Sequence, residues 1–388
     1  MEKALSGYRI LDFGRYIAGP YAAMLLAEQG AEVIKIEPPE GDPCRSHDGF
    51  MVWNRSKKGI ILDLKKEQGQ KIALDLAKSS DVIIENFRPD VAERLGIGYE
   101  AVRKENPNII YCSISGFGRK GPYRDLPGWD AMVASLSCAY LEHGGGSGYP
   151  PLYLVLPLPS YYSAFMASFS IVTALYAREI TGMGQRIDLS LFCSMIAAVS
   201  AGLVDFSGRI RIPFTDPQGA LPLYKFYQAS DGKWFFLGLG NMTFFTKFAI
   251  AMEREEWLAD PRFEGAPFLI FPPVSNEIIA EFKEIFSQKT RDEWLAFFQS
   301  EDIPCAAASS VEEFLNDPQV AANKMVIEIE ESDLGLVREM GIPVRLRATP
   351  GEIQGRSPRL GEHTHEVLKT FIGGTDRELA VLKEQGII

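Results

Sequence analysis

Tyr8-Arg-Ile-Leu-Asp-Phe13 is an apolar run that Gly14-Arg-Tyr-Ile-Ala-Gly19-Pro20 follows directly. The run predicts a buried strand, because a short apolar segment bounded by glycine is typical of a parallel sheet. Pro20 predicts the first position of a helix that continues through Tyr21 to Gln29 and ends at Gly30. Glu32-Val-Ile-Lys-Ile36 then predicts a second strand.

The alternation of strands and helices continues along the chain. Helices are expected over 66–79 and 99–105, and strands over Val82-Ile-Ile84, over Ile109 to Ile114 and at Ile187-Asp-Leu-Ser-Leu191. This order predicts an α/β fold, in which helices cover both faces of a parallel sheet. Ligands bind such sheets where strands end and helices begin. The active surface is therefore expected near residues 14–20, 37–40, 86–90 and 115–122.

The length of the chain predicts more than one domain. At roughly 150 residues per domain, 388 residues correspond to two or three. Residues 205–225 are rich in Gly, Pro and Arg and are interpreted as a linker. A second unit follows, with a strand at Trp234-Phe-Phe-Leu237 and then aromatic-rich helices. Val326-Ile-Glu-Ile-Glu330 and Arg345-Leu-Arg347 are expected to be strands that return to the first domain.

Charge and cysteine usage restrict the classes of function. Lys and Arg number 40 against 51 Asp and Glu, so the net charge is 40 − 51 = −11, which disfavours a nucleic acid partner. The N-terminal residues are charged and have no apolar core behind them, so no secretory signal is expected. Five cysteines without a CxxC pair are typical of reduced thiols, which predicts a cytoplasmic location.

Two uncharged stretches, 160–177 and 189–204, are interpreted as buried core helices and not as membrane spans. In the first, the small residues Ser160, Ala164 and Ser168 recur four apart. That spacing places them on one helical face and lets another backbone approach closely. No membrane partner is expected.

Nucleotide and metal motifs are absent. The segment from Gly14 to Gly19 lies between a strand and a helix, as a phosphate loop does, but Pro20 stands where the loop needs lysine. The dinucleotide-binding pattern GxGxxG is absent at this position. Cys44 with His47, and His363 with His365, have no third ligand nearby, so no metal is expected.

Basic residues gather at the expected mouth of the sheet, although the chain as a whole is acidic. They are Arg15, Lys57, Lys58, Arg88 and Arg94. Each alone is typical of a solvated surface charge, whereas together they indicate a local anion site. Asn86-Phe-Arg-Pro89 comes directly after a predicted strand, so this loop faces the ligand crevice.

A series of short motifs occurs in a fixed order. They are Leu5-Ser-Gly-Tyr-Arg-Ile-Leu-Asp-Phe13 with Ala18-Gly-Pro20; Gly30-Ala-Glu-Val-Ile-Lys-Ile-Glu37; Asn54 with Lys57; Leu62-Asp-Leu64; Glu85-Asn-Phe-Arg-Pro89; Ser115-Gly-Phe-Gly118 with Gly121-Pro122; Ala174-Leu-Tyr-Ala-Arg178 with Thr181-Gly-Met-Gly-Gln185; and Pro358-Arg-Leu-Gly-Glu-His-Thr364. Together they resemble the class III coenzyme A transferases, the family of formyl-CoA, carnitine and benzylsuccinate CoA-transferases that also includes α-methylacyl-CoA racemases. The resemblance spans nearly the whole chain.

The resemblance implies a large Rossmann-like domain over 1–204 that 332–388 complete, and a smaller α+β domain over 226–331. It also implies a dimer of two interlocked rings, for which the small-residue helix would provide close packing. Coenzyme A or an acyl-CoA is the implied substrate. Carried over position by position, the CoA-contacting residues are Arg15, Ala18, Lys57, Asn86, Phe87, Arg88 and Arg94.

The family's chemistry depends on an aspartate that precedes the small-residue helix, and this chain departs from the pattern there. The aspartate lies about nineteen positions before an Arg-Glu pair, here Arg178-Glu179, and 179 − 19 = 160. Ser160 occupies that position, and a serine ester cannot become an acyl-CoA. Asp130 is the nearest carboxylate by motif. Trp129 stands where the racemases place a catalytic histidine, which disfavours racemase chemistry.

The leading hypothesis is a CoA-transferase subunit without the nucleophile, inactive alone, that works in a heteromer with a related chain carrying the aspartate. The benzylsuccinate-type enzymes, with succinyl-CoA as donor, are the precedent that the resemblance supplies. Two alternatives remain: a self-sufficient homodimeric transferase in which another carboxylate, with Asp130 as the first candidate, is the nucleophile, and a non-enzymatic CoA-binding or regulatory protein.

Overall fold

The computed structural model describes residues 2–142, 150–208, 218–219, 221–331 and 333–388. The chain divides into two compact units. The first, here called the large unit, comprises Met1–Ser137, Val155–Val204 and Ala321–Ile388. The second, the small unit, comprises Cys138–Leu154 and Asp205–Val320.

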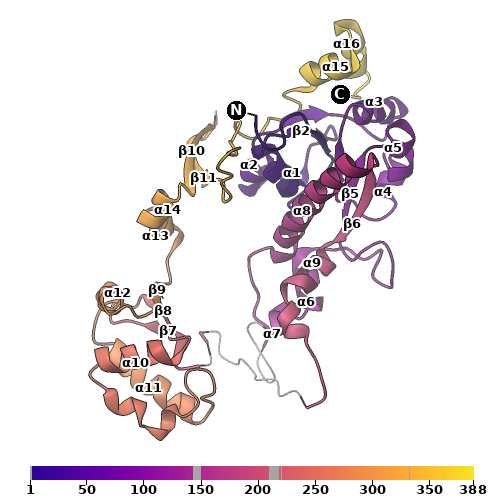
Figure 1. The fold of residues 1–388 in the computed structure, drawn as a ribbon. Coiled ribbons are helices and arrows are strands. Elements are labelled where there is room, and N and C mark those ends of the chain that lie inside the picture. Colours follow the sequence, from indigo (N-terminus) through magenta and orange to yellow (C-terminus); the bar gives the residue numbers. More distant parts are fainter. Residues whose placement is uncertain (1, 143–149, 209–217, 220, 332) are drawn as a thin grey trace. The chain divides into compact units, whose positions relative to one another are not determined.

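A six-stranded parallel sheet forms the centre of the large unit, which confirms the predicted α/β class (Figure 1). Its strand order is β3-β2-β1-β4-β5-β6, the Rossmann order. The chain therefore reverses direction across the sheet between β1 and β4, which places a crevice beyond their carboxyl ends. The strands are β1 (Arg9–Asp12), β2 (Glu32–Glu37), β3 (Lys58–Ile61), β4 (Val82–Glu85), β5 (Ile110–Ser115) and β6 (Gln185–Ser190).

Helices cover both faces of this sheet (Figure 1). On one face α1 (Ala18–Glu28) and α8 (Leu158–Thr181) pack against each other. On the other, α3 (Glu67–Lys78), α5 (Tyr99–Glu105) and α15 (Thr364–Ile372) share an apolar core with strand residues such as Leu11 and Ile34. The other α-helices described in this unit are α2 (Gly49–Asn54), α4 (Val91–Arg94), α6 (Asp130–Leu136), α9 (Leu191–Ala198) and α16 (Asp376–Glu384).

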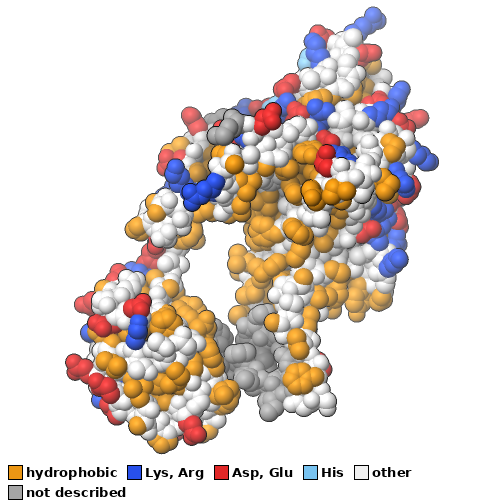
Figure 2. Space-filling model, in the orientation of Figure 1, with side chains coloured by type: hydrophobic (Ala, Val, Ile, Leu, Met, Phe, Trp, Pro, Cys, Tyr) orange, Lys and Arg blue, Asp and Glu red, His pale blue; other side chains and the backbone are white. Residues whose placement is uncertain are grey.

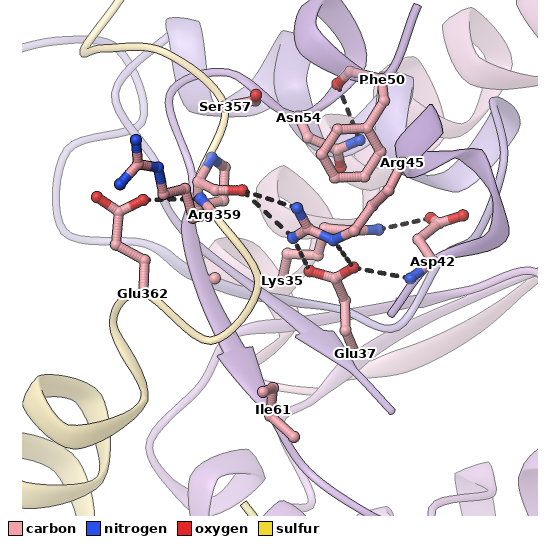
Figure 3. Close-up of polar contacts among 12 residues, drawn as sticks. Lys35, Glu37, Asp42, Arg45, Phe50, Asn54, Ile61, Ser357, Arg359 and Glu362 are labelled. Atoms are coloured by element: carbon pink, nitrogen blue, oxygen red, sulfur yellow. Dashed lines mark hydrogen bonds and ion pairs between the residues drawn. The ribbon is translucent and has the colours of Figure 1, made fainter. Parts of the chain in front are cut away.

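The C-terminal segment is fastened to the N-terminal half of the large unit. Arg45 lies 2.5 Å from the carboxylate of Glu37 and donates to the backbone oxygen of Pro358 at 3.2 Å (Figure 3). The backbone N–H of His363 donates to the carbonyl of Gly59 at 2.9 Å. Residues far apart in sequence therefore form one compact unit around β2 and β3.

An aromatic core fills the small unit. The antiparallel strands are β7 (Tyr224–Gln228), β8 (Trp234–Gly238) and β9 (Cys305–Ala307), in the order β7-β8-β9. They pack on α10 (Met242–Ala251), α11 (Val274–Phe286) and α12 (Arg291–Ser300) through buried rings such as Phe235, Phe282 and Trp294. Shorter helices are α7 (Ala139–Glu142), α13 (Val311–Leu315) and α14 (Pro318–Ala322).

Two details of the predicted elements are wrong. Residues Arg345 to Arg347 form no strand; instead β10 (Val326–Glu331) pairs antiparallel with β11 (Gly335–Met340) as a separate ribbon. Helix α1 begins at Ala18, so Pro20 is its third residue and not its first. Proline fits there because the first four N–H groups of a helix have no partner within the helix.

One face of α8 is apolar and exposed, and hydrophobic side chains gather along this helix (Figure 2). Six of the exposed residues follow one another at helical spacing from Phe165 onward, and they are Phe165, Met166, Phe169, Val172, Tyr176 and Ile180. They are here called the α8 apolar stripe. Although α8 has 24 residues, no helix among the described residues combines the length and hydropathy that a membrane crossing requires.

Candidate active site

A cavity of about 580 Å³ lies in the large unit. Loops that follow three neighbouring strands contribute to its wall: Tyr16 to Ala18 after β1, Asn86 to Pro89 after β4, and Ser115 with Gly116 at the end of β5. Arg124, residues 126–130 and the start of α8 also contribute to it. The cavity therefore lies in the crevice that the strand order predicts.

The side-chain amide of Asn86 joins the loops after β1 and β4. Its Oδ1 accepts from the backbone N–H of Arg15 at 2.7 Å, and its Nδ2 donates to the carbonyl of Arg15 at 2.8 Å. The Arg15 guanidinium lies 5.6 Å from the centre of the Phe87 ring. These contacts fix the two loops at a constant separation.

Arg88 is exposed at the cavity and forms no ion pair with any residue that the structure describes. Arg124 also lines the cavity, but its guanidinium is paired with Asp90 and lies 3.1 Å from Asp125. Arg88 is therefore the cation at this wall that is available to an anionic ligand.

Lys57 is buried beneath the cavity wall and does not line it. Its ammonium donates to Asp12 Oδ2 and to the Pro20 carbonyl at 2.8 Å each, and to Asn54 Oδ1 at 3.0 Å. Burial lowers the pKa of Lys57 to about 8, against the opposing effect of Asp12. By bonding Pro20, Lys57 fixes the first turn of α1, which presents Ala18 to the cavity.

Four of the seven predicted CoA-contacting residues line the cavity: Ala18, Asn86, Phe87 and Arg88. Arg15 lies beside them through its contacts with Asn86 and Phe87. Lys57 does not line the cavity, and neither does Arg94, which is exposed on the short helix α4.

Asp130 and Ser160 meet at the wall of the cavity. Ser160 donates twice to the same carboxylate: its backbone N–H lies 2.8 Å from Asp130 Oδ1, and its hydroxyl lies 2.8 Å from Oδ2. Ser160 belongs to the first turn of α8, where backbone N–H groups have no partner within the helix. Burial raises the pKa of Asp130, and the two bonds from Ser160 oppose that rise.

A close backbone contact positions the loop that precedes Asp130. A Cβ on Gly116 would lie 2.6 Å from the Cα of Gly128, and a Cβ on Gly128 would lie 2.3 Å from the Cα of Gly116. Only glycines permit this approach between the end of β5 and the start of α6. Trp129 lies in this loop with its ring centre 5.0 Å from that of Tyr16, edge to face.

Several lining residues were not predicted as site residues, including the aromatic side chains Trp53 and Tyr161. Cys44 and His47, considered above only as a metal pair, also line the cavity. The described residues contain no group of three or more His, Cys, Asp or Glu with the geometry of a metal site. The rings of Trp53 and His47 are stacked with their centres 5.7 Å apart, and this contact could not be predicted from their sequence positions.

The arrangement combines three chemical features. Its wall is largely apolar and aromatic, one unpaired arginine faces it, and it contains a single carboxylate, that of Asp130, among the described lining residues. A carboxylate in such a wall can act as a base or as a nucleophile toward an activated acyl group.

The chain matches the family described as "CoA-transferase family III" over residues 5–364. It is 30% identical to the succinyl-CoA–D-citramalate CoA-transferase of Chloroflexus aurantiacus, across 100% of this chain and 98% of the relative. It is 32% identical to both the alpha and the beta subunit of the succinyl-CoA–L-malate CoA-transferase of that organism; each match covers 99% of this chain, with 92% of the alpha subunit and 98% of the beta subunit. A crystal structure of a CAIB/BAIF family protein from Brucella suis superposes with a TM-score of 0.83 at 29% identity, covering 96% of this chain and all of that one.

Proposed function

Because the chain belongs to CoA-transferase family III, we propose that it moves coenzyme A from an acyl-CoA donor to a carboxylic acid at the cavity of its large unit. The observation that carries this proposal is the convergence of Ala18, Asn86, Phe87 and Arg88 with the carboxylate of Asp130 on one cavity. These side chains suit a ligand with an anionic part and a reactive acyl part.

Coenzyme A carries phosphates and a long arm with polar and apolar parts. The cavity wall offers arginine side chains to the phosphates and apolar side chains to the arm. Arg88 lacks a counter-ion among the described residues, so a phosphate or carboxylate would meet it without displacing a protein anion. Arg15 stacks near Phe87 at the edge of the same wall and adds positive potential. On a chain of net charge −11 these two arginines give the wall a local positive potential that favours an anion.

We propose succinyl-CoA as the donor. Three of the relatives are named as transferases of succinyl-CoA.

The experiment is titration calorimetry with coenzyme A, followed by an assay of CoA transfer from succinyl-CoA to a panel of carboxylic acids. Arg88→Ala should weaken CoA binding about ten-fold, as expected for loss of one charge-assisted hydrogen bond of about 1.5 kcal/mol. Arg377→Ala is the matched control, because Arg377 is exposed on α16 and does not line this cavity. Absence of CoA binding by the wild-type chain would refute the proposal.

A second candidate is a heteromer in which a related chain supplies the nucleophile and this chain completes the site. Ser160 favours it, because a hydroxyl replaces the carboxylate of the family pattern. The subunit names of the malate-transferase relatives also favour it. Co-purification with a related chain, and transfer activity only in the mixture, would support this candidate.

We further propose that the chain is cytosolic and that it assembles as the interlocked dimer expected from the resemblance. All five cysteines are free thiols, which is typical of proteins in a reducing compartment. The α8 apolar stripe supplies a surface that a second chain would cover.

A further inference from the structure

We propose that Asp130 is the nucleophile of this chain, with Ser160 as the residue that holds and orients it. The inference rests on the proposed function of CoA transfer and names the group that carries the acyl and CoA moieties covalently. It places the reactive carboxylate on the N-terminal residue of α6, thirty positions before Ser160, which stands where the family pattern has the aspartate.

The position of the carboxylate is the first argument. Both oxygens of Asp130 lie 2.8 Å from atoms of Ser160, the residue at the family's nucleophile position. The carboxylate therefore occupies the space directly in front of the first turn of α8. A carboxylate supplied from residue 130 reaches the region that a side chain at residue 160 would reach.

The composition of the wall is the second argument. Asp130 is the single Asp or Glu among the described residues that line the cavity. No described neighbour offers another carboxylate for a mixed anhydride. Among the described residues, Asp130 therefore carries the one carboxylate that an acyl-CoA bound in this cavity would contact.

The chemistry closes without any further reactant. An oxygen of Asp130 attacks the thioester carbonyl of the donor; the new C–O bond gives a mixed anhydride as the C–S bond breaks and releases CoA thiolate. The thiolate attacks the Asp130 carbonyl carbon, and the donor acid leaves as a carboxylate. The aspartyl-CoA thioester is then attacked by the acceptor carboxylate. CoA thiolate leaves again, and its attack on the acceptor carbonyl forms the product acyl-CoA and restores Asp130.

Ser160 can stabilise the negative charge that forms on Asp130 when a nucleophile attacks the Asp130 carbonyl carbon. Each thiolate or carboxylate attack at that carbon places negative charge on an Asp130 oxygen. The Ser160 N–H already points at Oδ1 from 2.8 Å, so it donates to that charge without rearrangement. A carboxylate oxygen accepts more than one hydrogen bond, so the bond from the Ser160 hydroxyl leaves Oδ2 a lone pair for attack.

The alternative role of Asp130 is structural. A carboxylate that accepts the N–H of a first-turn residue also stabilises the start of a helix. Asn retains an oxygen that accepts this N–H but cannot form an anhydride. Asp130→Asn therefore separates the covalent role from the structural one.

The test is covalent trapping on the full-length chain. Succinyl-CoA, and acetyl-CoA in a parallel sample, are mixed with the protein; hydroxylamine then converts an aspartyl thioester to a hydroxamate, and mass spectrometry of peptides locates it. The wild-type chain should carry the hydroxamate at Asp130. Asp130→Asn should carry none while it binds CoA within two-fold of wild type and unfolds at an unchanged urea midpoint.

Two further variants test the part played by Ser160. Ser160→Ala keeps the backbone donor and loses the hydroxyl, so labelling should remain at Asp130 at a rate about ten-fold lower, as expected for loss of one hydrogen bond. The exchange variant Asp130→Ser/Ser160→Asp should transfer the hydroxamate to residue 160. Labelling that persists in Asp130→Asn would overturn the inference.

Failure of the inference is distinguishable from failure of the proposed function. If CoA binds but neither thioester labels the wild-type chain, the role of Asp130 is overturned and CoA transfer with a nucleophile from another chain stands. If CoA does not bind, the proposed function falls and the inference falls with it.

Discussion

Lys57 and Asp12 are charged residues that solvent does not reach. Their side chains are fully buried, and the ammonium lies 2.8 Å from Asp12 Oδ2. Asp12 Oδ1 also accepts the backbone N–H of Gly14 at 2.8 Å. The pair therefore holds two segments in place, the loop after β1 and the first turn of α1 through Pro20. Both segments lead to the cavity, so a pair outside the site determines its shape.

Lys57→Met should destabilise the chain by roughly 3–5 kcal/mol, because it leaves Asp12 charged, buried and unpaired. The double variant Asp12→Asn/Lys57→Met should recover much of that loss, since it removes both charges together. Urea denaturation at pH 7 measures both. Equal destabilisation by the single and the double variant would show that packing, and not the lone charge, causes the loss.

Glu85 gives the stability a pH dependence. It lies at the end of β4, is almost fully buried and accepts from the Phe87 N–H at 2.8 Å. Burial raises its pKa from 4.5 to about 7. Between pH 4.5 and pH 7 the Glu85 carboxyl is protonated in more of the folded chains than of the unfolded chains. The free energy of unfolding therefore decreases as the pH rises through this range. Above pH 7 the decrease is complete and amounts to at most about 3 kcal/mol.

Glu85→Gln should therefore stabilise the chain at pH 8 and have little effect at pH 4.5. The urea midpoint measured at several pH values checks this, with exposed Glu100→Gln on α5 as the control. A difference between Glu85→Gln and wild type that is the same at pH 4.5 and pH 8 would contradict the assignment.

Single residues were predicted by type and order, but their surroundings were not. Lys57 is basic and follows Asn54 in a motif, which indicated a ligand contact; its burial depends on Asp12, forty-five positions earlier. Asp130 and Ser160 were each singled out, yet the sequence gives no reason why residues thirty positions apart should share two hydrogen bonds. Contacts of this kind depend on tertiary packing, which periodicity does not encode.

At the scale of elements, most strands of the parallel sheet and the long helices were predictable, and several short segments were not. Strand β3 was not predicted, because it has only four residues, begins with Lys58-Gly59 and is preceded by a second lysine. Arg345 to Arg347 alternates like a strand but pairs with no described strand, whereas Gly335 to Met340 pairs with β10. Pairing decides such short segments, and a partner is not visible in local sequence.

The loop between β5 and α6 yields a prediction at this scale. Gly128→Ala would place a Cβ 2.3 Å from the Cα of Gly116, so one of the two loops must move. Destabilisation by about 1–3 kcal/mol is expected from the overpacking, together with loss of labelling at Asp130, because the displaced loop carries that residue. Gly202→Ala is the control, since its Cβ would meet no atom within 4 Å. Unchanged labelling in Gly128→Ala would show that the loop tolerates the shift.

At the scale of the whole molecule, the α8 apolar stripe remains to be explained. Phe169 is 70% exposed and Tyr176 68%, on a helix whose opposite face packs against α1. Contiguous exposed apolar surface of this kind is typical of an interface between chains. The proposed dimer covers the stripe with a second chain, whether an identical copy or a related subunit.

Phe169→Glu should therefore dissociate the assembly, because the dimer would bury a charge without a partner. We expect the dissociation constant to rise at least about 100-fold, equivalent to roughly 3 kcal/mol. Light scattering coupled to size exclusion at micromolar protein measures the mass. Val311→Glu is the matched control, since Val311 is 76% exposed on α13 and lies outside the stripe. A wild-type chain that is monomeric alone but dimeric with a related chain would assign the stripe to a heteromer; a Phe169→Glu variant that assembles as wild type does would show that another surface joins the subunits.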